Sequence, residues 1–130
     1  MSDVDVKIME RFGTYDTIEC CCITKSIMTD LYIDEYERTL ESYKNMIEKQ
    51  QIMVHTLRSI GSNDLLSVLY DDIKLYTTRK DSVERLIELY KKKKEYEVKL
   101  MMCSDLDQIL FKGCISKLEN MIVAQKLKGY

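Results

Sequence analysis

The side chains in this sequence that could support acid–base catalysis are few. The chain has one histidine, His55, which lies between Val54 and Thr56. A catalytic histidine needs a nucleophile or a carboxylate within hydrogen-bond reach. Gln51, one helical turn away, is an amide and supplies neither. We therefore interpret His55 as a surface or partly packed residue and predict no catalytic residue.

Five cysteines could bind a metal or form disulfides, but their spacing favours neither. Cys20, Cys21 and Cys22 are adjacent, while Cys103 and Cys114 stand apart. Structural zinc sites use C-x₂₋₄-C pairs so that two thiolates converge, and adjacent cysteines have poor disulfide geometry. We predict no metal, no cofactor and reduced thiols in an intracellular compartment, either cytoplasm or nucleus.

The glycine-rich motifs of common enzyme classes are missing from the sequence. It contains no G-x-x-x-x-G-K-[ST], G-x-G-x-x-G or G-x-S-x-G, and four isolated glycines cannot build a phosphate cradle. We therefore expect a non-enzymatic protein without a small-molecule substrate.

A basic stretch between Lys74 and Lys94 offers a second kind of chemistry, contact with phosphates. It holds eight basic residues against three acidic ones, and nearby tyrosines could stack on bases. Four consecutive lysines point in every direction around a helix, however, and make a collar that is usually a solvated face. Binding of single-stranded nucleic acid or an acidic partner is therefore the second hypothesis, with these contact residues: Arg79, Lys80, Arg85, Lys91, Lys92, Lys93 and Lys94.

The composition indicates which kind of secondary structure holds these candidate side chains. The 130 residues are 45% hydrophobic and 32% charged with a formal charge of −2, and they include no proline. Proline and glycine usually mark the turns between strands and in loops, so their scarcity favours an all-α single domain.

The N-terminus lacks a secretory signal and no stretch is apolar enough to span a membrane, so we expect a soluble protein with no membrane partner.

The firmest helix prediction covers residues 31–60. Apolar positions recur there at alternating steps of three and four, with Gln50 as the only polar member, a heptad pattern that forms a stripe on one face. Gly61 is expected to end this helix as a C′ glycine. We call this stripe the seam and predict that it binds a partner; its residues are Ile33, Tyr36, Leu40, Tyr43, Ile47, Val54 and Leu57.

Two further helices are predicted at 62–102 and 104–128. Ser62, Asn63 and Asp64 should cap the first, which either runs unbroken or breaks near 77–81, with the unbroken form favoured. Ser104 and Asp107 resemble a capping box for the second. Residues 1–30 are predicted to be less regular. Asp16 and Glu19 are expected to cap a short helix there that ends at Ile27.

The last helix has its own stripe of apolar residues at helical spacing. Gly113 inside it is expected to mark a close helix crossing, and the adjacent Met101–Met102 pair is a candidate exposed contact patch. The stripe consists of Leu106, Ile109, Leu110, Cys114, Leu118, Met121 and Ile122.

Helix length then predicts the shape. A 40-residue helix spans roughly 60 Å, whereas a compact domain of this size has a radius of gyration near ~14 Å. We predict an antiparallel helical bundle or an elongated helical hairpin with coiled-coil-like heptad packing. An overhanging apolar stripe needs a partner, so the leading hypothesis is a protein–protein interaction module: an adaptor, assembly or scaffold subunit that binds a protein partner, a second copy, or both.

Overall fold

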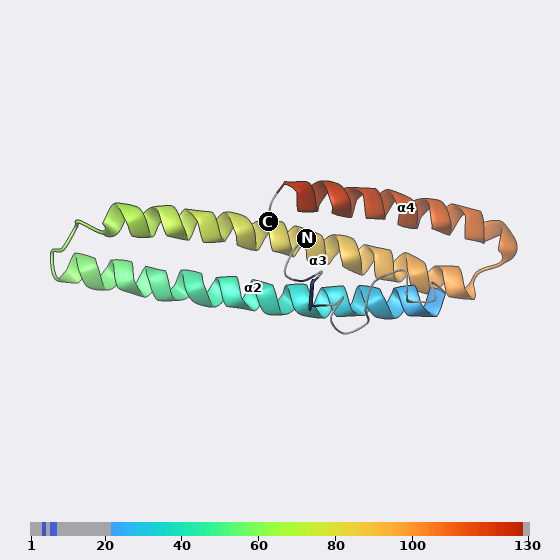
Figure 1. Ribbon diagram of the computed structural model, residues 1–130, viewed down its shortest axis with the longest axis horizontal. Coiled ribbons are helices and arrows are strands. Elements are labelled where there is room, and N and C mark those ends of the chain that lie inside the picture. The colour runs from blue at the N-terminus through green and yellow to red at the C-terminus, as the bar shows by residue number, and fades with distance from the viewer. Residues whose placement is uncertain (1–3, 5, 8–21, 129–130) are drawn as a thin grey trace.

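The computed structural model describes residues 4, 6–7 and 22–128. They include three long helices, α2 (Cys22–Ser59), α3 (Leu66–Met102) and α4 (Asp105–Leu127), and no strand occurs among the described residues. α2 and α3 form an antiparallel hairpin, and α4 folds back along the C-terminal part of α3 (Figure 1). The prediction of an all-α protein is confirmed, in its elongated form with a third helix.

α3 is the central helix, because it packs against both α2 and α4. With 37 residues it is roughly 55 Å long, whereas the 23 residues of α4 span only roughly 35 Å. The part of the hairpin near its turn therefore extends beyond α4 (Figure 1). Coiled-coil-like heptad packing between α2 and α3 stays a prediction.

The turn that ends α2 matches the prediction at Gly61. This glycine has a φ of 73°, in the left-handed region that favours glycine. Ser62 N–H donates to Leu57 O at 2.9 Å, and Gly61 N–H donates to Arg58 O at 3.2 Å. These two bonds form a Schellman motif, which satisfies carbonyls that the helix end would otherwise leave without donors.

The starts of α3 and α4 differ from the predicted caps. α3 begins at Leu66, and no side chain caps it; instead Leu66 N–H donates to the backbone carbonyl of Asn63 at 3.3 Å. Ser104 does precede α4, but its hydroxyl donates to the Asp107 carboxylate at 3.4 Å rather than to a backbone amide. Backbone contacts in the first turn thus replace the side-chain caps.

α3 is unbroken across residues 77–81, as the favoured form of the prediction had it. Thr77 and Thr78 donate their hydroxyl hydrogens to the carbonyls of Ile73 and Lys74, at 2.7 and 2.9 Å. These bonds to the preceding turn hold the threonines inside the helix.

The expected short helix ending at Ile27 is wrong. α2 runs without a break from Cys22, and Ser26, Met28 and Thr29 are buried. Packing therefore continues the helix through a segment that looked irregular in sequence. Asp16 and Glu19 lie outside the described residues.

The core lies where all three helices overlap. Its centre is a stack of tyrosines: the rings of Tyr32 and Tyr90 are 5.1 Å apart, and Tyr36 and Tyr90 are 5.6 Å apart. The Lys126 ammonium group of α4 lies over Tyr32 and Tyr90, at 5.0 and 5.6 Å from the ring centroids. Aliphatic side chains surround this stack, among them Val83, Leu86, Ile87, Leu118 and Ile122.

Candidate functional site

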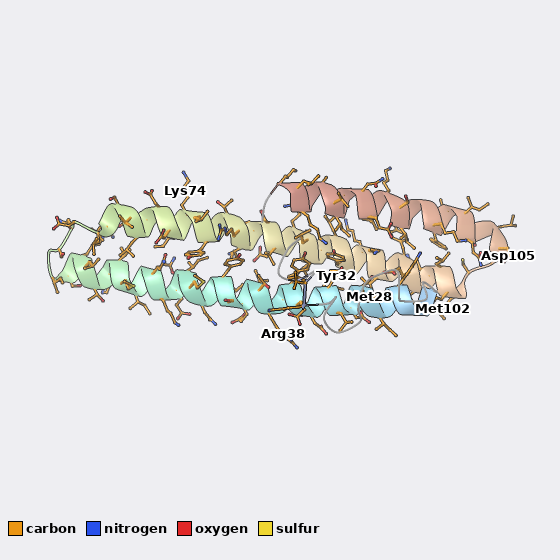
Figure 2. All side chains as sticks on the ribbon, in the orientation of Figure 1. Met28, Tyr32, Arg38, Lys74, Met102 and Asp105 are labelled. Carbon is orange, nitrogen blue, oxygen red and sulfur yellow. The ribbon has the colours of Figure 1, made fainter. Side chains whose placement is uncertain are left out.

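The seam lies inside the hairpin. Tyr36 and Val54 are buried and the other five seam residues are half-buried. The Tyr43 ring lies 6.1 Å from the Tyr76 ring of α3, and in Figure 2 Tyr32 also lies between the two helices. The seam therefore holds α2 to α3, and its binding to a separate partner stays a prediction.

The lysine collar, Lys91–Lys94, contacts both neighbouring helices. Lys91 pairs with Glu37 at 3.4 Å, and Lys94 pairs with Asp30 at 2.7 Å, both on α2. Lys93 points to the other side and pairs with Glu119 of α4 at 3.6 Å. Because successive residues fan out around a helix, neighbouring lysines reach different helices. Three of the four thus join α3 to its neighbours.

The rest of the basic stretch is less concentrated. Lys80 contacts Asp81 and Glu84 on its own helix, at 4.0 and 3.9 Å. Arg85 and Lys92 are exposed, and Arg79 is half-buried. Figure 2 places Lys74 on the side of α3 that faces away from α2. The structure does not gather these cations into one groove.

α4 has two apolar faces, and only one of them packs on α3. Leu118, Ile122 and Gln125 are buried on the inner face. Away from this inner face, Leu106 is 89% exposed, Ile109 80%, Leu110 63%, Val123 55% and Leu127 83%. We call these five residues the α4 outer face.

The apolar residues predicted at helical spacing on the last helix do not all pack on α3. Leu118 and Ile122 pack against the core, whereas Leu106, Ile109, Leu110 and Met121 are exposed. At 100° per residue, Ile109 and Leu118 lie on opposite sides of a helix. A single neighbouring helix cannot cover both, so the apolar set divides into an inner and an outer face.

Gly113 does not mark a close crossing among the described helices. It is exposed, and a Cβ built on it would meet nothing within 4 Å. α3 packs on the other side of α4, so Gly113 lies on the outward side. The exposure expected for Met101 and Met102 is confirmed, at 41% and 83%.

A cavity of about 220 Å³ lies at the junction of the three helices. Glu97 of α3, a residue that is only 3% exposed, contributes a carboxyl group. Its Oε1 accepts a hydrogen bond from the Thr29 hydroxyl of α2 at 2.6 Å, while its Oε2 has no hydrogen-bond partner among the described residues. The cavity is lined by Lys25, Glu97, Leu100, Lys112, Ile115, Ser116 and Glu119.

Burial raises the pKa of Glu97, because removal from water penalises the charged form. The Thr29 hydroxyl and the ammonium groups of Lys93 and Lys94 oppose this effect, and Glu119 adds to it. Glu97 therefore holds its proton more strongly than an exposed glutamate. Its bond to Thr29 joins α3 to α2, which assigns it a structural role.

The remaining reactive side chains stand apart from one another. His55 is exposed, and Ser59 donates its hydroxyl hydrogen to the backbone carbonyl of His55 rather than to the ring. Cys103 and Cys114 are free and half-buried. Cys20 and Cys21 lie outside the described residues.

The described part of the chain has neither a metal-binding cluster nor a membrane-spanning helix. No group of three His, Cys, Asp or Glu side chains in residues 4, 6–7 and 22–128 could hold a metal ion. Over the same part of the chain, no helix has an apolar stretch long enough to cross a bilayer.

Sequence reasoning missed the α4 outer face as a separate surface. The signal was present: apolar residues occur on both sides of the last helix, and an amphipathic helix with a single packing face has them on one side only.

No protein-family model, curated protein or solved structure matches this chain.

Proposed function

We propose that this protein is a non-enzymatic interaction module, an adaptor, assembly or scaffold subunit, which docks an apolar helix of a protein partner on the α4 outer face. The observation that carries the proposal is the exposure of five large aliphatic side chains along one side of a single helix. Isolated exposed leucines are ordinary, whereas several large aliphatic side chains exposed along one helix are typical of an interaction surface.

The energetics support the same proposal. Complete burial of an exposed leucine, isoleucine or valine side chain yields about 1.5–3 kcal/mol. Because α3 already occupies the inner face of α4, a partner would bury the outer face without unfolding the hairpin. Complementary apolar side chains on a partner helix would pack at the usual interaxial distance of about 8–10 Å.

Nucleic-acid binding receives less support. Lys91, Lys93 and Lys94 already pair with carboxylates on α2 and α4, so contact with phosphates would have to break these pairs. The free thiols of Cys103 and Cys114 fit a reducing compartment, and we propose the cytoplasm or nucleus.

Two variants of the tagged protein test the proposal by quantitative capture. The outer-face variant, Leu106→Lys with Ile109→Lys, places charges where a partner would pack. The control, Ile52→Lys with Val68→Lys, charges two aliphatic residues of α2 and α3 that are also more than half exposed. Circular dichroism should show equal helix content in all three proteins.

We expect a protein, which can be a second copy of this chain, to be retained by the wild type and the control and lost from the outer-face variant. Retention of the same proteins by all three would contradict the proposal. A ratio of absorbance at 260 to 280 nm that is high and falls after a high-salt wash would instead support nucleic-acid binding.

A further inference from the structure

We propose that the partner of the α4 outer face is a second copy of this chain, with the two α4 helices antiparallel across a twofold axis. This inference rests on the proposed function, because it specifies what covers the same surface. A twofold interface uses the same patch on both subunits, so the patch must be complementary to itself. The distribution of apolar, small and charged residues along α4 meets that requirement.

The apolar residues of the outer face lie in two groups. Leu106, Ile109 and Leu110 occupy the N-terminal half of α4, and Val123 and Leu127 occupy the C-terminal half. In an antiparallel pair the N-terminal group of one copy lies against the C-terminal group of the other. Both groups of both copies would then be buried together.

The charges at the ends of α4 favour the antiparallel orientation. Asp105 and Asp107 lie in its first turn, and Lys128 follows its last residue. Antiparallel helices place the acidic end of one copy beside the basic end of the other, whereas parallel helices would place like charges together. The helix dipoles oppose each other favourably in the same arrangement.

The centre of the outward side allows the two backbones to approach. Gly113 has open space around it, and Asn120 on the same side is uncharged. Lys117 is exposed close to the midpoint of α4, so the two copies bring like charges near the twofold axis. This repulsion limits the affinity of the pair.

The size of the face sets the strength of the association. α4 spans roughly 35 Å and presents a strip about 10 Å wide, which is small beside the roughly 800 Å² that each partner buries in a standard interface. We therefore expect a weak dimer with a dissociation constant in the micromolar range, which forms at high concentration and dissociates on dilution.

Charge exchange along α4 tests both the partner and the orientation. The acidic variant carries Leu106→Glu and Leu110→Glu, and the basic variant carries Val123→Lys and Leu127→Lys. All four side chains are more than half exposed, and the new charges suit the helix dipole. A third variant combines the four substitutions in one chain. The mass in solution is measured by light scattering and sedimentation over a wide concentration range.

The wild type should approach twice its monomer mass of 15.4 kDa as its concentration rises. The acidic and basic variants should each dimerise at least ten times more weakly. An equimolar mixture of the two, and the combined variant alone, should recover dimers, because glutamates then face lysines of the other copy. Within one chain the two substituted groups are too far apart along α4 to pair.

A wild type that stays monomeric at every concentration would overturn the proposal of a second copy. That result is distinct from failure of the proposed function, which the capture experiment judges by whether a protein retained by the wild type and the control is lost from the outer-face variant. Dimers that the acidic and basic variants leave unchanged would show that another surface associates. Recovery in neither the mixture nor the combined variant would overturn the antiparallel orientation. Circular dichroism of each variant confirms that it is folded.

Discussion

Replacing Glu97 with glutamine tests the energetic account of the three-helix junction. Glu97 is almost fully buried, its Oε2 has no hydrogen-bond partner among the described residues, and burial raises its pKa. Glutamine has nearly the same shape and resembles the protonated carboxyl. The Thr29 hydroxyl lies within hydrogen-bond distance of both Glu97 Oε1 and the Lys25 carbonyl. The glutamine amide N–H could therefore donate to the Thr29 oxygen, while the Thr29 hydroxyl donates its hydrogen to the Lys25 carbonyl.

The sign of the pH effect follows from the direction of the pKa change. A carboxyl whose pKa is higher in the folded chain binds its proton more tightly there, so its contribution to stability falls as pH rises above the pKa of the unfolded chain. The loss is complete above the pKa of the folded chain. Glu97→Gln removes this titration and should therefore gain stability relative to wild type as pH rises.

The magnitude follows from the burial of the group. A buried polar atom without a partner costs about 1–3 kcal/mol, and more when the group is charged, so glutamine removes only the additional cost of the charge. Lys93 and Lys94 offset part of the cost because their charges favour the ionised form. We expect Glu97→Gln to raise the unfolding free energy by about 1–2 kcal/mol at pH 8, with little difference near pH 4.

Urea unfolding followed by circular dichroism between pH 4 and pH 8 measures this difference. Glu95→Gln is the matched control, because Glu95 lies on the same helix, is exposed and, among the described residues, pairs with nearby Lys99 at 3.3 Å. The control should differ from wild type by less than about 1 kcal/mol at every pH. A Glu97→Gln protein that loses stability with rising pH relative to wild type would refute the reasoning, since the lysines would then outweigh burial.

Three other predictions can be checked by the same unfolding measurement. Leu86→Ala should lower the unfolding free energy by about 2–5 kcal/mol, because Leu86 is fully buried in the core; a smaller change would mean that the junction is loosely packed. Gly61→Ala should cost about 1–2 kcal/mol, because a side chain there must adopt a positive φ, and an unchanged midpoint would contradict the Schellman turn. Lys94→Gln should cost on the order of 1 kcal/mol through its loss of Asp30, whereas Lys92→Gln should have no effect; equal effects would contradict the assignment of Lys94 as a link between helices.

Several features of the fold could be predicted from local sequence. The helix over residues 31–60 and its end at Gly61 follow from apolar spacing and from the one residue type that accepts a positive φ freely. The start of α4 after Ser104 follows from residues near the helix end. Helix formation and termination depend on neighbours within a few positions, so such signals can be interpreted without the fold.

Other features depended on contacts between distant segments. Residues 22–30 looked irregular, yet they continue α2 because Met28 and Thr29 are buried in the folded chain. The side-chain cap expected at Asn63 is missing, because a backbone carbonyl serves the first turn of α3. The burial of Glu97 beside Thr29, 68 positions away in sequence, has no local signal.

The amino-acid sequence by itself determined that this chain is helical and where its three long helices end. Only the tertiary structure decided that α3 takes one apolar side of α4 and leaves Leu106, Ile109 and Leu127 exposed, and that Lys91 and Lys93 pair with different helices. The physical reason is that periodicity describes positions around one helix axis. Burial and ion pairing depend instead on which second helix lies against each side.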